Sequence, residues 1–142
     1  MKVFFDTNIL IDYLARRQQF YHDAALTISL CDKMGFQMLV SALSFATASY
    51  IMSSHGKMSS VVIKNLFENF VKQSRVTPID TKTIDESIVS EFEDFEDAMQ
   101  YYSALREQAD VIITRNKDDF EAAQIPIYEP KEFIDLMVNK HR

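Results

Sequence analysis

The chain has 142 residues, a length typical of one domain, and 47% of them are hydrophobic. With only two glycines and three prolines, the composition excludes a disordered or collagen-like chain, and a single cysteine excludes an internal disulfide framework. The net charge of −6 disfavours broad non-specific binding to nucleic acid, because such binding normally needs a basic surface.

Apolar spacing and turn residues predict strands that alternate with helices. In the N-terminal half we expect a strand at 2–5, helices at 9–14 and 20–33, a strand at 36–40, and helices at 41–56 and 60–70. In the C-terminal half we expect a strand at 75–77, helices at 80–91 and 92–108, a strand at 111–113, a brief helix at 117–121 capped by Asn116, an edge strand at 125–128 and a final helix from Pro130. This order predicts an α/β fold, with a mainly parallel sheet of four to five strands and helices on both faces.

The sequence contains no apolar run long enough to span a bilayer. Its first residues, MKVFFD, lack the apolar core and cleavage site of a secretory signal. No repeat, low-complexity tract or linker interrupts the pattern. We therefore expect a cytoplasmic protein without a membrane partner, in which residues 1–142 form one domain.

Polar side chains are concentrated where parallel strands would end, and ligand sites of such sheets lie beyond these ends. The first strand is followed by Asp6, Asn8 and Asp12, the fourth by the segment TRNKDD at 114–119, and the helix before the fourth strand begins with Asp94 and Asp97. Oxygen ligands in this number suit Mg²⁺ or Mn²⁺ better than zinc. The pattern predicts a metal site, although an Asp after a strand is often only a helix cap.

Four segments together resemble the PIN domain family. They are FDTNILIDYL at 5–14, VSALSFATASYIM at 40–52, DFEDAMQYYSAL at 94–105 and ADVIITRNKDDF at 109–120. The chain resembles the subgroup with FEDA and TRNKDDF motifs, often described as VapC-like toxins. The resemblance implies a PIN-like three-layer α/β/α fold over the whole chain and a Mg²⁺- or Mn²⁺-dependent endoribonuclease.

The resemblance also implies roles for individual residues. Asp6, Asp97 and Asp119 are expected to be catalytic, and Asp6, Asp97 and Asn116 are expected to bind the metal ion. Supporting roles are implied for Asn8, Asp94 and Thr114, and Thr47 is expected to contribute only a neutral oxygen. Arg115 and Lys117, which lie beside the acids, are candidates for contacts with the phosphates of RNA.

The second motif departs from the family pattern. The family usually has Glu three residues beyond the second hydroxyl of an S-x-x-S/T-x-x-E frame, and here Ser41, Ser44 and Thr47 occupy that frame. No acidic residue lies between Asp32 and Glu68. Fewer carboxylate ligands bind a divalent cation more weakly, so the departure bears on activity rather than on the fold.

Two other interpretations remain open at this point. The missing Glu motivates a PIN scaffold that binds protein or RNA without cleaving it. An aspartyl-phosphate enzyme is disfavoured, because enzymes of the haloacid dehalogenase type have a second Asp where this chain has Asn8.

The resemblance further implies RNA as substrate, a small antitoxin protein as partner, and a homodimer. Aromatic and methionine side chains suit such an interface or, equally, the core; they are Tyr13, Phe20, Tyr21, Met52 and Met58.

Overall fold

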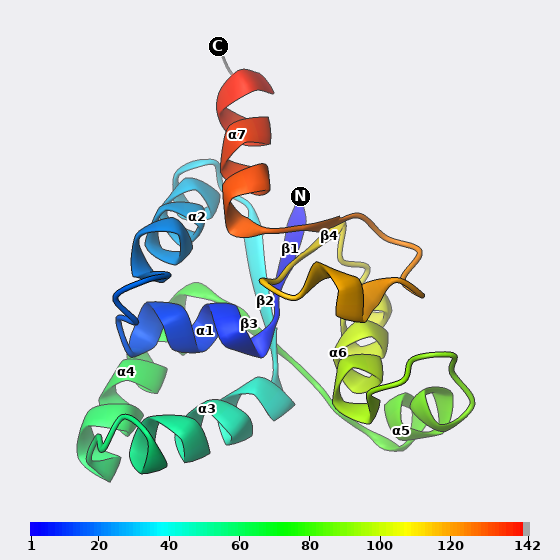
Figure 1. The fold of residues 1–142 in the computed structure, drawn as a ribbon, viewed down its shortest axis with the longest axis horizontal. Coiled ribbons are helices and arrows are strands. Elements are labelled where there is room, and N and C mark those ends of the chain that lie inside the picture. The colour runs from blue at the N-terminus through cyan, green and yellow to red at the C-terminus, as the bar shows by residue number, and fades with distance from the viewer. Residues whose placement is uncertain (141–142) are drawn as a thin grey trace.

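A computed structural model of the chain describes residues 1–140 and contains a five-stranded parallel sheet flanked by helices (Figure 1). The strands are β1 (Lys2–Phe5), β2 (Gln37–Ser41), β3 (Arg75–Thr77), β4 (Val111–Ile113) and β5 (Ile127–Tyr128). The helices are α1 (Thr7–Leu14), α2 (Tyr21–Lys33), α3 (Ala42–Ser54), α4 (Ser60–Gln73), α5 (Thr81–Ile88), α6 (Phe95–Arg106) and α7 (Pro130–Lys140), and a short 3-10 helix, η1, covers Lys117–Phe120. The predicted α/β class is confirmed.

The sheet has the strand order β3-β2-β1-β4-β5, with every neighbouring pair parallel. Strand β1 is central, and the chain builds the sheet outward from it in one direction through β2 and β3 and in the other through β4 and β5. The direction therefore reverses between β1 and β4, and open α/β sheets bind ligands beyond the carboxyl ends of the strands at such a point.

Alternate residues of the strands face two separate cores. On one face, Val3 and Phe5 of β1 pack with residues of α1, α2, α3, α4 and α7. On the other face, Phe4 packs with Tyr101 and Ala104 of α6. The sheet is thus the middle of three layers, as the alternation of strands and helices predicts.

Side chains cap most helices where the sequence indicates. The side-chain oxygens of Asp6, Ser41, Ser59 and Asp80 each accept a hydrogen bond from a backbone N–H at the start of α1, α3, α4 and α5. The predicted cap of the brief helix is wrong, because the side chain of Asn116 makes no capping bond there.

The boundary between α5 and α6 also differs from the prediction. Helix α5 ends at Ile88 rather than near 91, and α6 begins at Phe95 rather than 92. Asp94 causes the later start, because its carboxylate accepts the backbone N–H of Asp97 and so caps α6.

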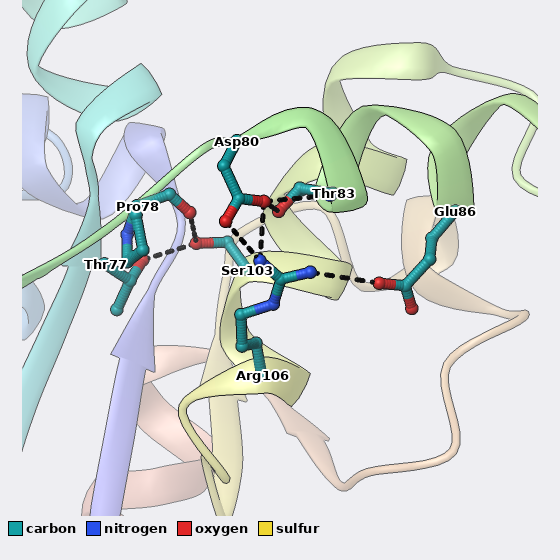
Figure 2. A network of polar contacts seen from close by, with 7 residues as sticks. All are labelled: Thr77, Pro78, Asp80, Thr83, Glu86, Ser103 and Arg106. Atoms are coloured by element: carbon teal, nitrogen blue, oxygen red, sulfur yellow. Dashed lines mark hydrogen bonds and ion pairs between the residues drawn. The ribbon is translucent and has the colours of Figure 1, made fainter.

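Helix α5 is attached to α6 by a polar network (Figure 2). The guanidinium of Arg106 donates to the carboxylates of Asp80 and Glu86. Beside it, the hydroxyl of Ser103 donates to the carbonyl of Pro78 and hydrogen-bonds the Thr77 hydroxyl. These bonds tie α5 and the end of β3 to α6, and thereby hold α6 against the sheet.

Of the residues considered for an interface, Met52 is completely buried in the core, and Tyr13 and Met58 pack against that core. Met52 is therefore a core residue. Within residues 1–140, no helix combines the length and the apolar character that a membrane span requires.

Candidate functional site

Asp6 stands at the carboxyl end of the central strand. Its backbone N–H donates to the carbonyl of Ile113 at 2.9 Å, which places it beside the end of β4. Its side chain is 6% exposed and is held through both oxygens. Oδ1 accepts the backbone N–H of Thr7 at 2.8 Å, and Oδ2 accepts the hydroxyl of Thr114 at 2.8 Å. The carboxylate of Asp6 therefore caps α1 and is itself held in one orientation by these bonds.

Asn8 links Asp6 to β4. Its amide nitrogen donates to Oδ2 of Asp6 at 3.3 Å and to the hydroxyl of Thr114 at 3.4 Å, and its Oδ1 accepts the backbone N–H of Arg115 at 3.3 Å. Thr114 also accepts the backbone N–H of Asn116 at 3.0 Å. These bonds explain why the turn after β4 does not need a cap from the Asn116 side chain.

A buried polar network supports Asp6 from the other side. The amide nitrogen of Gln100 donates to Oδ1 of Asp6 at 3.2 Å, to the hydroxyl of Thr7 at 2.9 Å and to that of Ser44 at 2.8 Å. The hydroxyl of Ser41 donates to Oε1 of Gln100. Gln100 has no exposed surface, so this network fixes the position of α6 relative to β1 and α3.

The sequence motifs do not single out Gln100. The signal that identifies it is helical spacing, because Gln100 follows Asp97 by three residues in α6 and therefore lies on the same face. A polar residue on a helix face that otherwise packs against the sheet needs a buried partner, and Asp6 provides one.

Six of the residues that the sequence indicates line one cleft of about 290 Å³ at the ends of β1 and β4. They are Asp6, Asn8, Asp94, Asp97, Asn116 and Asp119, and Glu96 joins them. Among the described residues, Arg17 is the one basic residue in the lining, and it lies 3.5 Å from Asp12 and is therefore already paired. In this part of the chain the cleft thus carries five carboxylates without a matching set of cationic side chains.

The acids of the cleft raise one another's pKa. Burial raises the pKa of Asp6 more than its hydrogen bonds lower it, and the charge of Asp119 adds to the increase. For Asp97, partial burial and then the charges of Asp6, Asp94, Asp119 and Glu96 raise the pKa from 3.8 to about 7. A cation bound in the cleft would reduce the repulsion between these carboxylates.

Glu96 is the neighbour that the sequence analysis missed. Burial and then the charges of Asp94 and Asp6 raise its pKa, whereas a hydrogen-bonding contact with the side chain of Thr47 lowers it. Thr47 occupies the position at which the family pattern has Glu. Glu96 thus lines the cleft from α6, whereas Thr47 leaves α3 without a carboxylate.

Arg115 and Lys117 lie outside this cleft lining and are engaged elsewhere. Nε of Arg115 donates to Oδ2 of the buried Asp12 at 2.6 Å, and its guanidinium carbon lies 3.8 Å from the centre of the Phe20 ring. Nζ of Lys117 lies 3.1 Å from a carboxylate oxygen of Glu132. Contacts between these two side chains and RNA stay a prediction.

The donor chemistry of the cleft fits Mg²⁺ or Mn²⁺, which prefer carboxylate and carbonyl oxygens. Within residues 1–140, no group of three or more Asp, Glu, His or Cys side chains is arranged to hold a metal ion directly. Mg²⁺ usually keeps several waters and is held by only one or two carboxylates, so the arrangement is compatible with such an ion.

Comparisons with known proteins identify the family and the fold. The family model described as PIN domain matches residues 2–118. A solved structure, VapBC2 from Rickettsia felis bound to a DNA fragment from its promoter, matches with a TM-score of 0.66 and 17% sequence identity, over 91% of this chain and 98% of that one. No curated protein matches the sequence. The match of the family model over most of the chain shows that it belongs to the PIN domain family.

Proposed function

We propose that this chain is a divalent-metal-dependent endoribonuclease and the toxin of a toxin–antitoxin pair. The observation that carries the proposal is the cleft at the ends of β1 and β4, where hydrogen bonds hold Asp6 among four other carboxylates that have no cationic partner within residues 1–140. A cleft of this charge repels the phosphates of RNA unless a cation is present, so metal binding and RNA binding are expected to be coupled.

Asp6 and Asp97 are the residues that would hold the ion, and the amide oxygen of Asn116 would add a neutral ligand. Bound Mg²⁺ or Mn²⁺ would supply Lewis-acid activation of water and neutralise charge on the phosphodiester. Asp119 would accept a hydrogen bond from the attacking water, and Asp94 would add negative charge at the rim. Thr114, Asn8 and Gln100 fix the direction of the Asp6 carboxylate.

Cleavage of RNA by the wild type, Asp6→Asn and Asp135→Asn in the presence of Mn²⁺ tests the proposal. Asp135 is exposed on α7, so its substitution changes the net charge equally without touching the cleft. Wild type and Asp135→Asn should cleave, and Asp6→Asn should lose at least about a hundred-fold in rate. Equal cleavage by wild type and Asp6→Asn would refute the assignment.

The ends of the RNA products provide a further check. Hydrolysis by water leaves no 2′,3′-cyclic phosphate, whereas attack by the neighbouring 2′-hydroxyl does. Cyclic phosphate ends in all products would indicate a metal-independent mechanism or a contaminating nuclease. Loss of cleavage on chelation of the metal should accompany linear ends.

The toxin role and its partner rest on family membership and on the likeness to VapBC2, which is a complex bound to DNA. We propose a small antitoxin protein as the partner, a homodimeric state and a cytoplasmic location. Induced expression of the chain should arrest growth, co-expression of the short reading frame next to its gene should relieve the arrest, and Asp6→Asn should cause none. Arrest by Asp6→Asn would contradict the catalytic basis of toxicity.

A non-catalytic scaffold is the second candidate. It is favoured by the substitution of Thr47 for the expected Glu and by the lack of a ready three-carboxylate group in residues 1–140. Calorimetric titration separates the two candidates, since a folded chain that binds neither Mg²⁺ nor Mn²⁺ at millimolar concentration would be a scaffold.

A further inference from the structure

A single cationic side chain stands in the described lining of the acidic cleft. Among residues 1–140 the lining contains five carboxylates and one basic residue, Arg17. Arg115 and Lys117, which the sequence singles out, do not line the cleft, and both are engaged by carboxylates elsewhere. Arg17 is therefore the described side chain of this lining that can attract an anion without help from a metal ion.

A tight turn at the end of α1 fixes the backbone of Arg17. Arg16 has a φ of 52°, a left-handed conformation that residues with a side chain rarely adopt. The chain reverses there, so the backbone N–H of Arg17 donates to the carbonyl of Asp12 at 3.1 Å. The carbonyl of Arg17 accepts the backbone N–H groups of Phe20 and Tyr21, at 2.9 and 2.7 Å. These backbone bonds hold Arg17 beside the end of α1.

The side chain of Arg17 is paired with a carboxylate that does not line the cleft. Its Nη1 lies 3.5 Å from Oδ1 of Asp12, whose side chain is 1% exposed. Asp12 does not depend on Arg17 for its position, because Arg115 donates to it through Nε at 2.6 Å and through Nη2 at 3.3 Å. One carboxylate therefore faces two guanidinium groups, and Arg17 is the more distant of the two. Within this group of three side chains, one positive charge has no matching carboxylate.

Arg17 keeps most of its hydrogen-bond donors available to a ligand. A guanidinium has five N–H donors in a planar fork that fits the oxygens of a phosphate. The 3.5 Å contact with Asp12 is longer than a usual N–H···O hydrogen bond, so it orients the group without using up these donors. The side chain is 35% exposed and lines the cleft together with Asn8 and Ile11 of α1. Its charge and its remaining donors are therefore accessible from the cleft.

Arg17 and Asp6 line the cleft from opposite ends of α1. Asp6 is the N-cap of this helix, and Arg17 follows its C-cap by two residues. The eight helical residues between the caps extend about 12 Å, so the two side chains meet a ligand at separate points. A strand of RNA carries a negative charge on each nucleotide, so a phosphate placed beside Asp6 is followed by others along the strand.

We propose that Arg17 binds a phosphate that flanks the scissile phosphate of the RNA, and that Asp12 holds the Arg17 side chain in place for this contact. The inference rests on the proposed ribonuclease function and deepens it, because it names a residue that binds the substrate strand away from the reacting bond.

The test is the rate of RNA cleavage by the full chain with Mn²⁺, at several substrate and salt concentrations. Arg17→Met should raise KM about five- to ten-fold and leave kcat within about two-fold, because the lost contact is made equally in the bound substrate and in the transition state. The slope of log KM against log salt should fall by about 0.7, the value for one phosphate contact on a single strand.

Arg16→Met is the matched control. It removes the same charge from the neighbouring residue, whose guanidinium lies 5.6 Å from the centre of the Tyr21 ring and which does not line the cleft. Its KM and its salt slope should stay close to those of the wild type. Equal losses in Arg16→Met and Arg17→Met would refute the proposal, because they would reflect net charge alone.

Two more variants keep the test independent of folding. Arg17→Met is expected to fold, because Asp12 retains both bonds from Arg115 and no buried charge is left unpaired. Arg17→Gln removes the charge with a polar side chain and repeats the test if the Arg17→Met chain does not fold. Arg17→Lys keeps the charge but lacks the fork, so it should recover the salt slope and part of the affinity. A folded Arg17→Lys chain as weak as Arg17→Met would refute a contact through charge.

The outcomes separate the inference from the proposed function. If the wild type cleaves RNA and Arg17→Met has the same KM and salt slope, the role of Arg17 is refuted and the function stands. A lower kcat at unchanged KM would also refute it, because a flanking contact is not confined to the transition state. If the wild type does not cleave RNA with Mn²⁺, the proposed function fails and the inference fails with it.

Discussion

Replacing Asp97 by Asn should stabilise the metal-free protein at neutral and alkaline pH. Partial burial and then the charges of neighbouring acids raise the pKa of Asp97 from 3.8 to about 7. The folded state therefore binds the Asp97 proton more tightly than the unfolded state does, and the free energy of unfolding falls as pH rises from about 4 to about 7. Asn carries no charge, so the free energy of unfolding of the variant does not fall in this way as the pH rises.

The size of the effect follows from the position of the side chain. A pKa increase from 3.8 to about 7 corresponds to about 4 kcal/mol if the charge is fully shielded from water. Asp97 is only partly buried, and solvent screening reduces the cost to about 1–2 kcal/mol. The charge also lies in the first turn of α6, where it gains about 0.3–1 kcal/mol from the helix N-terminus. A net gain of about 1 kcal/mol is expected for Asp97→Asn.

Urea unfolding at pH 8 and pH 5 measures this gain. At pH 8 the variant should be about 1 kcal/mol more stable than the wild type, which corresponds to a Tm higher by about 3 °C. At pH 5 the difference should be less than half as large, because Asp97 is then protonated in the folded wild type and only the first part of the pH range from about 4 to about 7 has been crossed. The control Asp135→Asn should show no such pH dependence. A variant that is equally or less stable at pH 8 would show that the acids of the cleft do not repel one another as argued.

Three further predictions concern the rest of the site. Gln100→Met should lower the free energy of unfolding by about 2–3 kcal/mol, measured in urea, because it removes the buried donor that Asp6 and Ser44 share; an unchanged stability would contradict the network. Arg115→Met should cost about 2 kcal/mol, since the carboxylate of Asp12, with 1% of its side chain exposed, would keep only the longer contact with Arg17. A cost below about 0.5 kcal/mol would leave Arg115 available for RNA. Mn²⁺ at one hundred times its Kd should stabilise the wild type by about 2.7 kcal/mol in thermal unfolding, and a similar gain in Asp6→Asn would place the ion elsewhere.

The order of strands and helices could be predicted because each element carries a local signal. Short apolar runs such as KVFF are too short for buried helices, and residues such as Ser41 and Asp80 mark helix starts through their capping bonds. The start of α6 was harder to predict, because Phe92 continues the apolar pattern of the helix upstream of its first residue. The helix begins instead after Asp94, whose side chain caps it.

The site could be predicted only in part for a different reason. Asp6, Asn8 and Thr114 follow strand ends, and strand order alone brings them together. Gln100 is placed by a hydrogen bond from α6 to α3 that joins two residues more than fifty positions apart in the sequence. A sequence pattern contains no direct record of such long-range contacts, so the motifs single out neither Gln100 nor Glu96.

This difference changes what the absence of a motif residue means. A motif records where a carboxylate is attached to the chain, whereas a cation responds to where the carboxylate oxygen lies in space. Position 47 lies on α3 and carries no charge, whereas Glu96, on α6, lines the cleft together with Asp6 and Asp97. The absence of Glu from α3 therefore leaves other carboxylates around Asp6. The scaffold interpretation predicts a cleft in which the remaining acids have been neutralised or paired. Within residues 1–140 this cleft retains five carboxylates, and the single arginine of its lining is already engaged by Asp12.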